Sequence, residues 1–248
     1  MQMAVSVIKN AISVFYNHLS NLRFLHDSQN KKQRSNYEER KKEWVCDEMC
    51  ILPRPVQSRL KGLLKKESDE SKRKGNKYFI VKDYLVIDLG LQTGLRVQEM
   101  CDLELRDLFL KDVLRPYIAI RHGKGNKYRR VRITKELVRH LKKYINWKKK
   151  IGEPVHERAP LFYSVRSEKF VTMTLQESFY RWIKKVTKIH HSIHDLRHTY
   201  ASELLVASGG DFLLVSRQLG HSSVAVTMEF YAHVIPEHAD KSLEKLYK

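Results

Sequence analysis

Apolar residues recur at helical spacing along most of this chain, and that pattern limits the folds it can adopt. An apolar run at 78–92 predicts a helix at the centre of the core, which Thr93-Gly94 then breaks. The period changes to two at 117–120 and 129–133, which predicts two strands joined by a glycine-rich turn at 123–126. The arginines interleaved with the apolar residues of the second strand should project from its other face. The expected fold class is mainly α with a small antiparallel β-sheet (α+β).

The same reasoning divides the rest of the chain into helices and connections. Further helices are predicted at 3–25, 55–65, 134–149, 175–188, 194–207, 211–219 and 222–232. The charged run 65–77 predicts an exposed loop, and Leu161-Phe162-Tyr163 with Phe170-Val171 predicts one more short strand. Two prolines just after residue 50 mark a boundary. We therefore expect a short helical N-terminal segment over 1–50 and a main domain over 51–248.

The charge balance points to a polyanionic partner. Lys and Arg total 47 against 28 Asp and Glu, a net charge of +19 over 248 residues. Such an excess favours nucleic acid, with a membrane surface or a generally basic soluble protein as alternatives. No apolar run reaches the roughly 18 residues that would suggest a membrane span. Three sparse cysteines, Cys46, Cys50 and Cys101, favour a reducing cytoplasm; the first two are one helical turn apart but lack partners at metal-site spacing.

Two upstream motifs combine basic side chains with features that could position them. Arg96 and Glu99 are three residues apart, so on a helix the carboxylate could preorganise the guanidinium, or the two could form an ordinary surface ion pair. The turn 123–126 carries Lys124, with Lys127 just after it. A lysine there could protonate a leaving oxygen, or the turn could simply be solvated. The residues by themselves do not separate the two lysines.

The predicted helix 194–207 begins with basic side chains that share one face. His194, Arg197 and His198 lie three and four residues apart. A guanidinium suits phosphate oxygens. The alternative is a metal site, because two histidines at i and i+4 with Asp195 resemble a zinc-hydrolase pattern. Against it, the fixed charge of Arg197 would work against binding a cation.

The last motif pairs a histidine with a tyrosine. His221 comes directly before Ser222, a predicted N-cap, so it should lie near a helix N-terminus that favours phosphate. Tyr231 offers an oxygen that can act as a covalent nucleophile. It also shares a helical stripe with Val224 and Met228, which alone indicates core packing.

In order and spacing, these motifs resemble the tyrosine recombinase (phage integrase) family over roughly residues 51–245, and they look most like its Xer-type and integrase members. The resembling stretches are Thr-Gly-Leu-Arg-Val-Gln-Glu at 93–99, Gly-Lys-Gly-Asn-Lys at 123–127, His-Asp-Leu-Arg-His at 194–198, Leu-Gly-His-Ser-Ser at 219–223 and Tyr-Ala-His at 231–233. The resemblance implies the catalytic-domain fold of that family and a site-specific recombinase that cleaves and rejoins DNA without metal, ATP or cofactor.

The resemblance also implies a role for each residue. The implied catalytic set is Arg96, Lys124, His194, Arg197, His221 and Tyr231, with Glu99 and His198 in support. Tyr231 would attack the phosphate to form a 3′-phosphotyrosine, while Arg96 and Arg197 hold the non-bridging oxygens. His194 and His221 would donate to the same phosphate, and His194 could take the tyrosine proton. Lys124 would protonate the departing 5′ oxygen.

The implied partner is double-stranded DNA, bound by a homo-tetramer on paired recombination sites, with or without an accessory protein, at the nucleoid in the cytoplasm. The expected DNA contacts from the hairpin are Lys127, Arg129, Arg130 and Arg132. The segment 1–50 is shorter than the DNA-clamping domain usual in the family, so it is an abbreviated clamp, has another job, or belongs to an incomplete chain. The segment 237–248 would dock on a neighbouring protomer or pack in cis. A DNA-binding protein without turnover and a metal-dependent hydrolase remain the alternatives.

Overall fold

The computed structural model describes residues 50–75, 78–112, 115–121, 128–165 and 167–234. All of them belong to the second of two compact units, Cys46–Lys248. The predicted helix 3–25, the hairpin turn 123–126 and the segment 237–248 lie outside the described residues. Within the described ranges, no helix combines the length and the apolar character needed to cross a bilayer.

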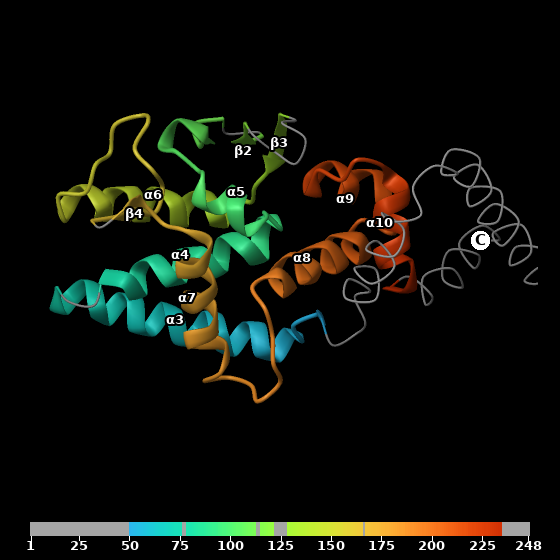
Figure 1. Ribbon diagram of the computed structural model, residues 1–248, viewed down its shortest axis with the longest axis horizontal. Helices are drawn as coiled ribbons and strands as arrows, with labels where there is room; N and C mark the ends of the chain where they lie inside the picture. The colour runs from blue at the N-terminus through green and yellow to red at the C-terminus, as the bar shows by residue number, and fades with distance from the viewer. Residues whose placement is uncertain (1–49, 76–77, 113–114, 122–127, 166, 235–248) are drawn as a thin grey trace, which may run out of the picture. The chain divides into compact units, whose positions relative to one another are not determined.

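The described elements are mostly helical, with two small antiparallel sheets (Figure 1). The helices are α3 (Arg54–Lys74), α4 (Tyr78–Thr93), α5 (Val97–Cys101), α6 (Lys135–Lys150), α7 (Thr172–Ile183), α8 (His194–Ala207), α9 (Phe212–Leu219) and α10 (Val224–Tyr231), with 3-10 turns η2 (Leu105–Asp107) and η3 (Ala232–Val234). The strands are β1 (Leu108–Phe109), β2 (Tyr117–Ile120), β3 (Arg129–Arg132), β4 (Tyr163–Ser164) and β5 (Glu168–Lys169). The expected mainly α fold with a small antiparallel sheet is confirmed.

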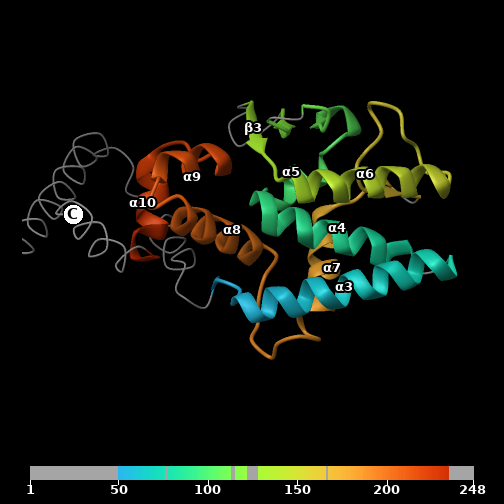
Figure 2. The same ribbon diagram turned by 180° about the vertical axis from the view of Figure 1, so that it is seen from behind.

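Helix α4 is the centre of the main core, as the apolar run at 78–92 predicted. It contacts α3, α6, α7 and α8, and both ribbon views show it between α3 and α6 (Figures 1 and 2). Gly90 allows α8 to approach closely, because a Cβ there would lie only 2.7 Å from Leu196 Cδ1. Buried Asp83 accepts hydrogen bonds from Ser178 Oγ and Trp182 Nε1, each at 2.7 Å, and so ties α4 to α7.

The prediction of an exposed loop at 65–77 is wrong, because α3 continues through most of this segment. The run consists largely of good helix formers, and its small residues Ser68 and Ser71 extend the buried face that begins with Leu64. Gly75 ends the helix in the left-handed region at φ 64°. High charge therefore indicated the solvent-facing side of a helix here, not the absence of one.

The two predicted strands form the antiparallel pair β2–β3, with Ile118 opposite Val131. Strand β1 adds a third member beside β2; at two residues it is too short to show a period in the sequence. Arg130 and Arg132 are exposed on the face away from the core, as expected. For Arg129 the expectation of an outward side chain is wrong. Strand parity puts it on the same side as Val131, and its side chain is only 11% exposed.

The remaining predicted elements are present with shifted ends. The extra strand is a two-residue pair, β4–β5, set between the buried Phe162 and Phe170. The helix expected at 175–188 is α7, which begins earlier, at Thr172. Thr134 caps α6 as its chemistry suggested, accepting from the amide of residue 137 at 3.1 Å. The N-cap of α10 is Ser223, one residue after the expected Ser222.

A second, smaller apolar cluster joins α8, α9 and α10. This C-terminal cluster consists of Ala201, Leu205, Val215, Leu219 and Tyr231. The expected helices at 194–207, 211–219 and 222–232 are confirmed as its three walls. Tyr231 is 2% exposed, so the core-packing interpretation of its ring is correct. Packing of the ring does not exclude chemistry at its hydroxyl.

Candidate active site

The site begins at the break between α4 and α5, where Gly94 allows α8 and α9 to pack closely against the chain. Gly94 has φ 59°, and a Cβ there would lie 2.5 Å from Tyr200 Cδ1 and 2.9 Å from Leu219 Cδ2. The position therefore needs glycine both for its backbone angle and for space. Arg96 follows as the residue that precedes α5, and its guanidinium crosses to α9, where NH1 lies 3.5 Å from Leu219 O and NH2 3.4 Å from Gly220 O.

Glu99 orients Arg96 from one turn further along α5. Its carboxylate accepts from the Arg96 backbone amide at 2.9 Å and from Arg96 NH1 at 3.0 Å. The Glu99 side chain is 4% exposed, so the surface ion pair considered above is wrong. Burial raises the pKa of this carboxyl, but the hydrogen bonds and charge of Arg129, with those of Arg96, outweigh burial and hold the pKa below its usual range. Glu99 is therefore charged at neutral pH.

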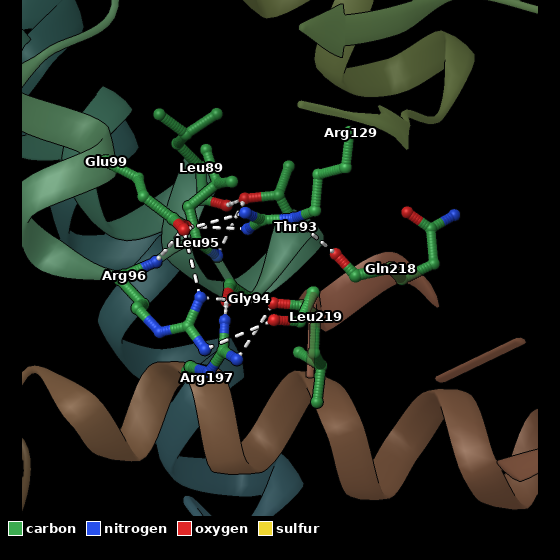
Figure 3. Close-up of polar contacts among 11 residues, drawn as sticks. Leu89, Thr93, Gly94, Leu95, Arg96, Glu99, Arg129, Arg197, Gln218 and Leu219 are labelled. Atoms are coloured by element: carbon green, nitrogen blue, oxygen red, sulfur yellow. Dashed lines mark hydrogen bonds and ion pairs between the residues drawn. The ribbon is translucent and has the colours of Figure 1, made fainter. Parts of the chain in front are cut away.

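Arg197 reaches the same backbone oxygens from α8. It is 7% exposed, and it donates through NH1 to Gly94 O at 2.6 Å and through NH2 to Leu219 O at 3.0 Å. Figure 3 shows the guanidinium groups of Arg96 and Arg197 converging beside Leu219. Burial, followed by the charge of Arg96, lowers the pKa of Arg197 to about 9, which still leaves it charged at neutral pH. Two like charges are thus held together at the end of α9.

His221 lies just past that end. Its Nδ1 is 2.8 Å from Thr227 Oγ1 on α10. When the threonine hydroxyl donates to Nδ1, the proton of the neutral imidazole is on Nε2 and can be donated to a ligand. Burial first, and then the charges of Arg197 and Arg96, lower the pKa of His221 to about 3. The histidine is therefore a neutral donor at physiological pH.

The Tyr231 hydroxyl is hydrogen-bonded to a histidine on α8. His198 Nδ1 lies 2.8 Å from it. Burial lowers the pKa of His198 to about 4, so the ring is neutral at physiological pH, and in the tautomer protonated at Nε2 its Nδ1 accepts the phenolic hydrogen. Burial, and next the charge of Arg197, also lower the pKa of His194. His198, which the sequence suggested only as a supporting residue, thus contacts the candidate nucleophile directly.

Asp195, which the metal alternative would require beside the two histidines, is engaged elsewhere. It lies 2.9 Å from His191 Nδ1 and accepts from the Ser192 hydroxyl at 2.7 Å, both in the segment before α8. Across the described ranges, no group of three His, Cys, Asp or Glu side chains is arranged to hold a metal ion. Cys50 is half-buried and Cys101 is buried.

The structure brings together seven of the residues singled out in the sequence, from α5 and the residue before it, α8, α10 and the segment after α9. They are Arg96, Glu99, His194, Arg197, His198, His221 and Tyr231. Lys124 and Lys127 lie outside the described residues. Of the expected DNA contacts, Arg130 and Arg132 are exposed on β3. The sequence did not indicate Thr227 or the carbonyls of Gly94, Leu219 and Gly220, because backbone acceptors have no side-chain signature.

These pKa values predict that the DNA-free protein loses stability as the pH falls below about 6.5. The pKa values of His198 and His221 in the folded protein are about 4 and about 3, below the value of 6.5 for a histidine in the unfolded chain. Between pH 6.5 and the folded-state pKa, the unfolded chain therefore binds protons that the folded chain does not. At pH 4 the free energy of unfolding should drop by roughly 2–3 kcal/mol per histidine. Urea unfolding at a series of pH values measures this drop.

Carboxylates also make the free energy of unfolding depend on pH in this range, so the contribution of a histidine is isolated by comparing variants. His221→Asn should flatten the dependence between pH 6.5 and 4. His190→Gln removes an exposed histidine and should leave it unchanged. Equal slopes in the wild type and His221→Asn would contradict the buried neutral state of His221.

Comparison with known proteins gives a consistent match. The family model described as "Phage integrase family" matches residues 64–238, more than half of the chain. A tyrosine recombinase XerC of Thermodesulfovibrio yellowstonii is 33% identical over 179 residues, covering 68% of this chain and 56% of the relative. A tyrosine recombinase XerA of Pyrococcus horikoshii is 26% identical, covering 66% and 55%. The chain thus spans about half the length of these curated relatives.

Solved structures agree on the fold. The crystal structure of XerA recombinase superposes with a TM-score of 0.60 at 26% identity, covering 80% of this chain and 65% of that one. The Tn1549 transposon integrase in complex with circular intermediate DNA has a TM-score of 0.60 at 22% identity, covering 81% and 68%, which bears on the fold alone. With the family match over 64–238, these findings show that the chain belongs to the phage integrase family.

Proposed function

We propose that this chain is the catalytic part of a site-specific DNA recombinase or integrase that cleaves and rejoins strands through a 3′-phosphotyrosine. One observation carries the proposal: Arg96, which precedes α5, and Arg197, in α8, both donate to Leu219 O although their charges repel. Paired guanidinium groups match the two non-bridging oxygens of a phosphodiester, on which charge increases in the transition state. The Xer recombinases among its relatives support the same function.

The proposed cleavage is a transesterification. The Tyr231 oxygen bonds to phosphorus as the bond to the 5′ oxygen breaks, the phenolic proton passes to a base, and the leaving oxygen takes up a proton. The 2.8 Å contact between the Tyr231 hydroxyl and His198 supports His198 as that base, beside the His194 that the family resemblance suggests. Lys124 is the proposed proton donor to the leaving oxygen. Because the phosphotyrosine keeps the energy of the phosphodiester, a 5′ hydroxyl can rejoin the strand without ATP.

Binding of the phosphate should itself activate the base. In the free site, burial and neighbouring positive charge keep His198 and His194 neutral and weakly basic. A phosphodiester between Arg96 and Arg197 would offset that charge, so the basicity of both histidines should rise when the substrate is bound. The arginines meanwhile supply the charge stabilisation that a metal ion gives in other phosphoryl-transfer enzymes.

The remaining assignments belong to the same proposal. Double-stranded DNA as partner is supported by the net charge of +19. Exposed Arg130 and Arg132 are proposed to contact its backbone, and Lys127 is proposed as a further contact. Assembly as a tetramer on paired sites, with or without an accessory protein, and a location at the nucleoid are proposed from the family resemblance.

The test is the formation of a covalent adduct in EDTA by the full chain. The probe is a pool of nicked duplexes with a randomised region next to the nick, so that the short cleaved strand diffuses away and traps the intermediate. We expect an adduct that survives SDS and is destroyed by protease, with the nucleotide mapped by mass spectrometry to the peptide containing Tyr231. Sequencing of the trapped DNA also supplies a preferred substrate for kinetic work.

Other outcomes point to the alternatives. Retention of DNA without any adduct would indicate a binding protein that has the fold without turnover. Strand hydrolysis that appears only when divalent metal is added would indicate a metal-dependent hydrolase.

A further inference from the structure

A third arginine, Arg129, is built into the site although the sequence suggested only that it contacts DNA. It begins β3, and its side chain is 11% exposed. NH1 donates to Glu99 Oε1 and NH2 to Glu99 Oε2, both at 2.7 Å, and Nε donates to Gln218 O at 3.3 Å. This fork-to-carboxylate geometry is among the strongest that a guanidinium can adopt, and it directs Arg129 towards the protein.

Glu99 is shared between Arg129 and Arg96. The carboxylate receives two hydrogen bonds from Arg129 and two from Arg96. The four charged groups Arg96, Glu99, Arg129 and Arg197 sum to +2, and without Arg129 they would sum to +1. The loss of this positive charge would act mainly on Arg96, because Arg96 would then be the one guanidinium hydrogen-bonded to Glu99 among the residues described here. Arg129 therefore leaves Arg96 free to act on a phosphate.

The three arginines meet at successive carbonyl oxygens where α9 ends. Gln218 O accepts from Arg129, Leu219 O from Arg96 and Arg197, and Gly220 O from Arg96 (Figure 3 draws Gln218 and Leu219). These carbonyls form the negative end of the helix dipole, which favours cations. A Cβ at Gly220 would lie 2.6 Å from Arg129 Cδ, so this turn is shaped to let the arginine pass.

A second contact secures the same strand. Gln218 Oε1 accepts from the Arg132 backbone amide at 3.0 Å, so β3 is joined to the end of α9 through both Arg129 and Gln218. Within the described residues, β3 is thus linked to α9 and, through Glu99, to α5. The link passes directly beside the guanidinium of Arg96.

We propose that Arg129 is a positioning residue: by holding and neutralising Glu99, it keeps Arg96 oriented and fully charged towards the phosphate. This inference rests on the proposed function, and it reassigns Arg129 from DNA contact to the interior of the site. Arg129 itself does not touch the reacting atoms.

Cleavage kinetics test the proposal with the trapped duplex as substrate. Arg129→Met should slow single-turnover cleavage by about 100-fold while DNA affinity changes by less than about threefold, since the lost interaction acts on the transition state. Arg130→Met, one residue along the same strand and exposed, is the matched control for losing one positive charge. As a DNA contact, it should weaken binding and reduce its salt dependence instead.

Two further measurements separate positioning from a merely structural role. Adding Glu99→Gln to Arg129→Met removes the unneutralised carboxylate and should restore cleavage by about tenfold. A scissile methylphosphonate, which lacks one negative charge, should shrink the defect of Arg129→Met by a similar factor, because a neutral substrate relies less on the charge of Arg96. A defect of the same size on both substrates, with no rescue by Glu99→Gln, would overturn the proposal.

Binding of inorganic phosphate provides a readout that does not depend on cleavage. Above neutral pH inorganic phosphate is mostly a dianion, so it carries more charge than the phosphodiester of DNA and is closer in charge to the transition state. Followed by ³¹P line width at such a pH, Arg129→Met should bind phosphate about tenfold more weakly than wild type, and the double variant should regain most of that affinity. Unchanged phosphate affinity in Arg129→Met would contradict the role of Arg129 even if the wild type formed no DNA adduct. A wild type that binds phosphate as expected but forms no adduct would instead remove the recombinase assignment.

Discussion

Replacing Tyr231 with phenylalanine is expected to abolish the covalent protein–DNA adduct completely. The phenyl ring has no oxygen to bond to phosphorus. The substitution should preserve the fold, because the ring is 2% exposed and packs in the C-terminal cluster, where phenylalanine fills the same space. Losing the hydrogen bond to His198 should cost only about 1 kcal/mol of stability. SDS gels of the nicked-duplex reaction measure the adduct.

Tyr200→Phe is the matched control. Tyr200 packs against the same cluster from α8 and has no role in the proposed chemistry. That variant should form the adduct at close to the wild-type rate. DNA affinity of Tyr231→Phe should stay within about twofold of wild type, because phosphate contacts do not require the phenolic oxygen. A persistent adduct in Tyr231→Phe would show that another residue is the nucleophile.

Replacing Arg197 with lysine is expected to slow cleavage by about 10³-fold although the positive charge is retained. Arg197 holds two carbonyl oxygens, Gly94 O and Leu219 O, with one planar fork. A lysine ammonium cannot reproduce that geometry, so it leaves a buried acceptor unpaired and does not present two parallel donors to a phosphate. Single-turnover cleavage of the trapped duplex measures the rate.

The control for this change is Arg217→Lys, an exposed position on α9. It should retain cleavage to within a few-fold of wild type. Thermal unfolding of Arg197→Lys distinguishes a chemical defect from a folding defect, since a folded variant with the expected rate loss supports the proposed clamp. A rate for Arg197→Lys close to that of Arg217→Lys would show that charge alone, without the fork, is sufficient.

Much of the fold could be read from local patterns. The central helix, the paired strands and the three C-terminal helices were predictable because each has enough residues to show a period. The loop expected at 65–77 was wrong because charged side chains can cover the outside of a helix whose buried face is continued by Ser68 and Ser71. Strand β1 was missed because two residues carry no periodic signal.

The candidate site likewise combines features that the sequence could indicate with contacts that it could not. Strand parity alone could have placed Arg129 on the side of Val131 and Ile133, so its inward direction was available in the sequence. Its partner was not, because Glu99 lies 30 residues away on another element. Nor could the pattern around His198 indicate its contact with Tyr231, 33 residues later, across a helix packing.

By itself, the sequence determined that this chain forms helices around a small sheet, and which side chains have the chemistry to hold and attack a phosphate. Both are local properties, set by residue spacing and residue type. Only the tertiary structure decided which groups meet: Arg197 and Arg96 reach Leu219 O across 22 and 123 residues. Backbone carbonyls are identical in every residue, so the sequence does not mark those that accept hydrogen bonds from the arginines. The packing of the end of α9 against α8 and the segment before α5 decides which carbonyls these are.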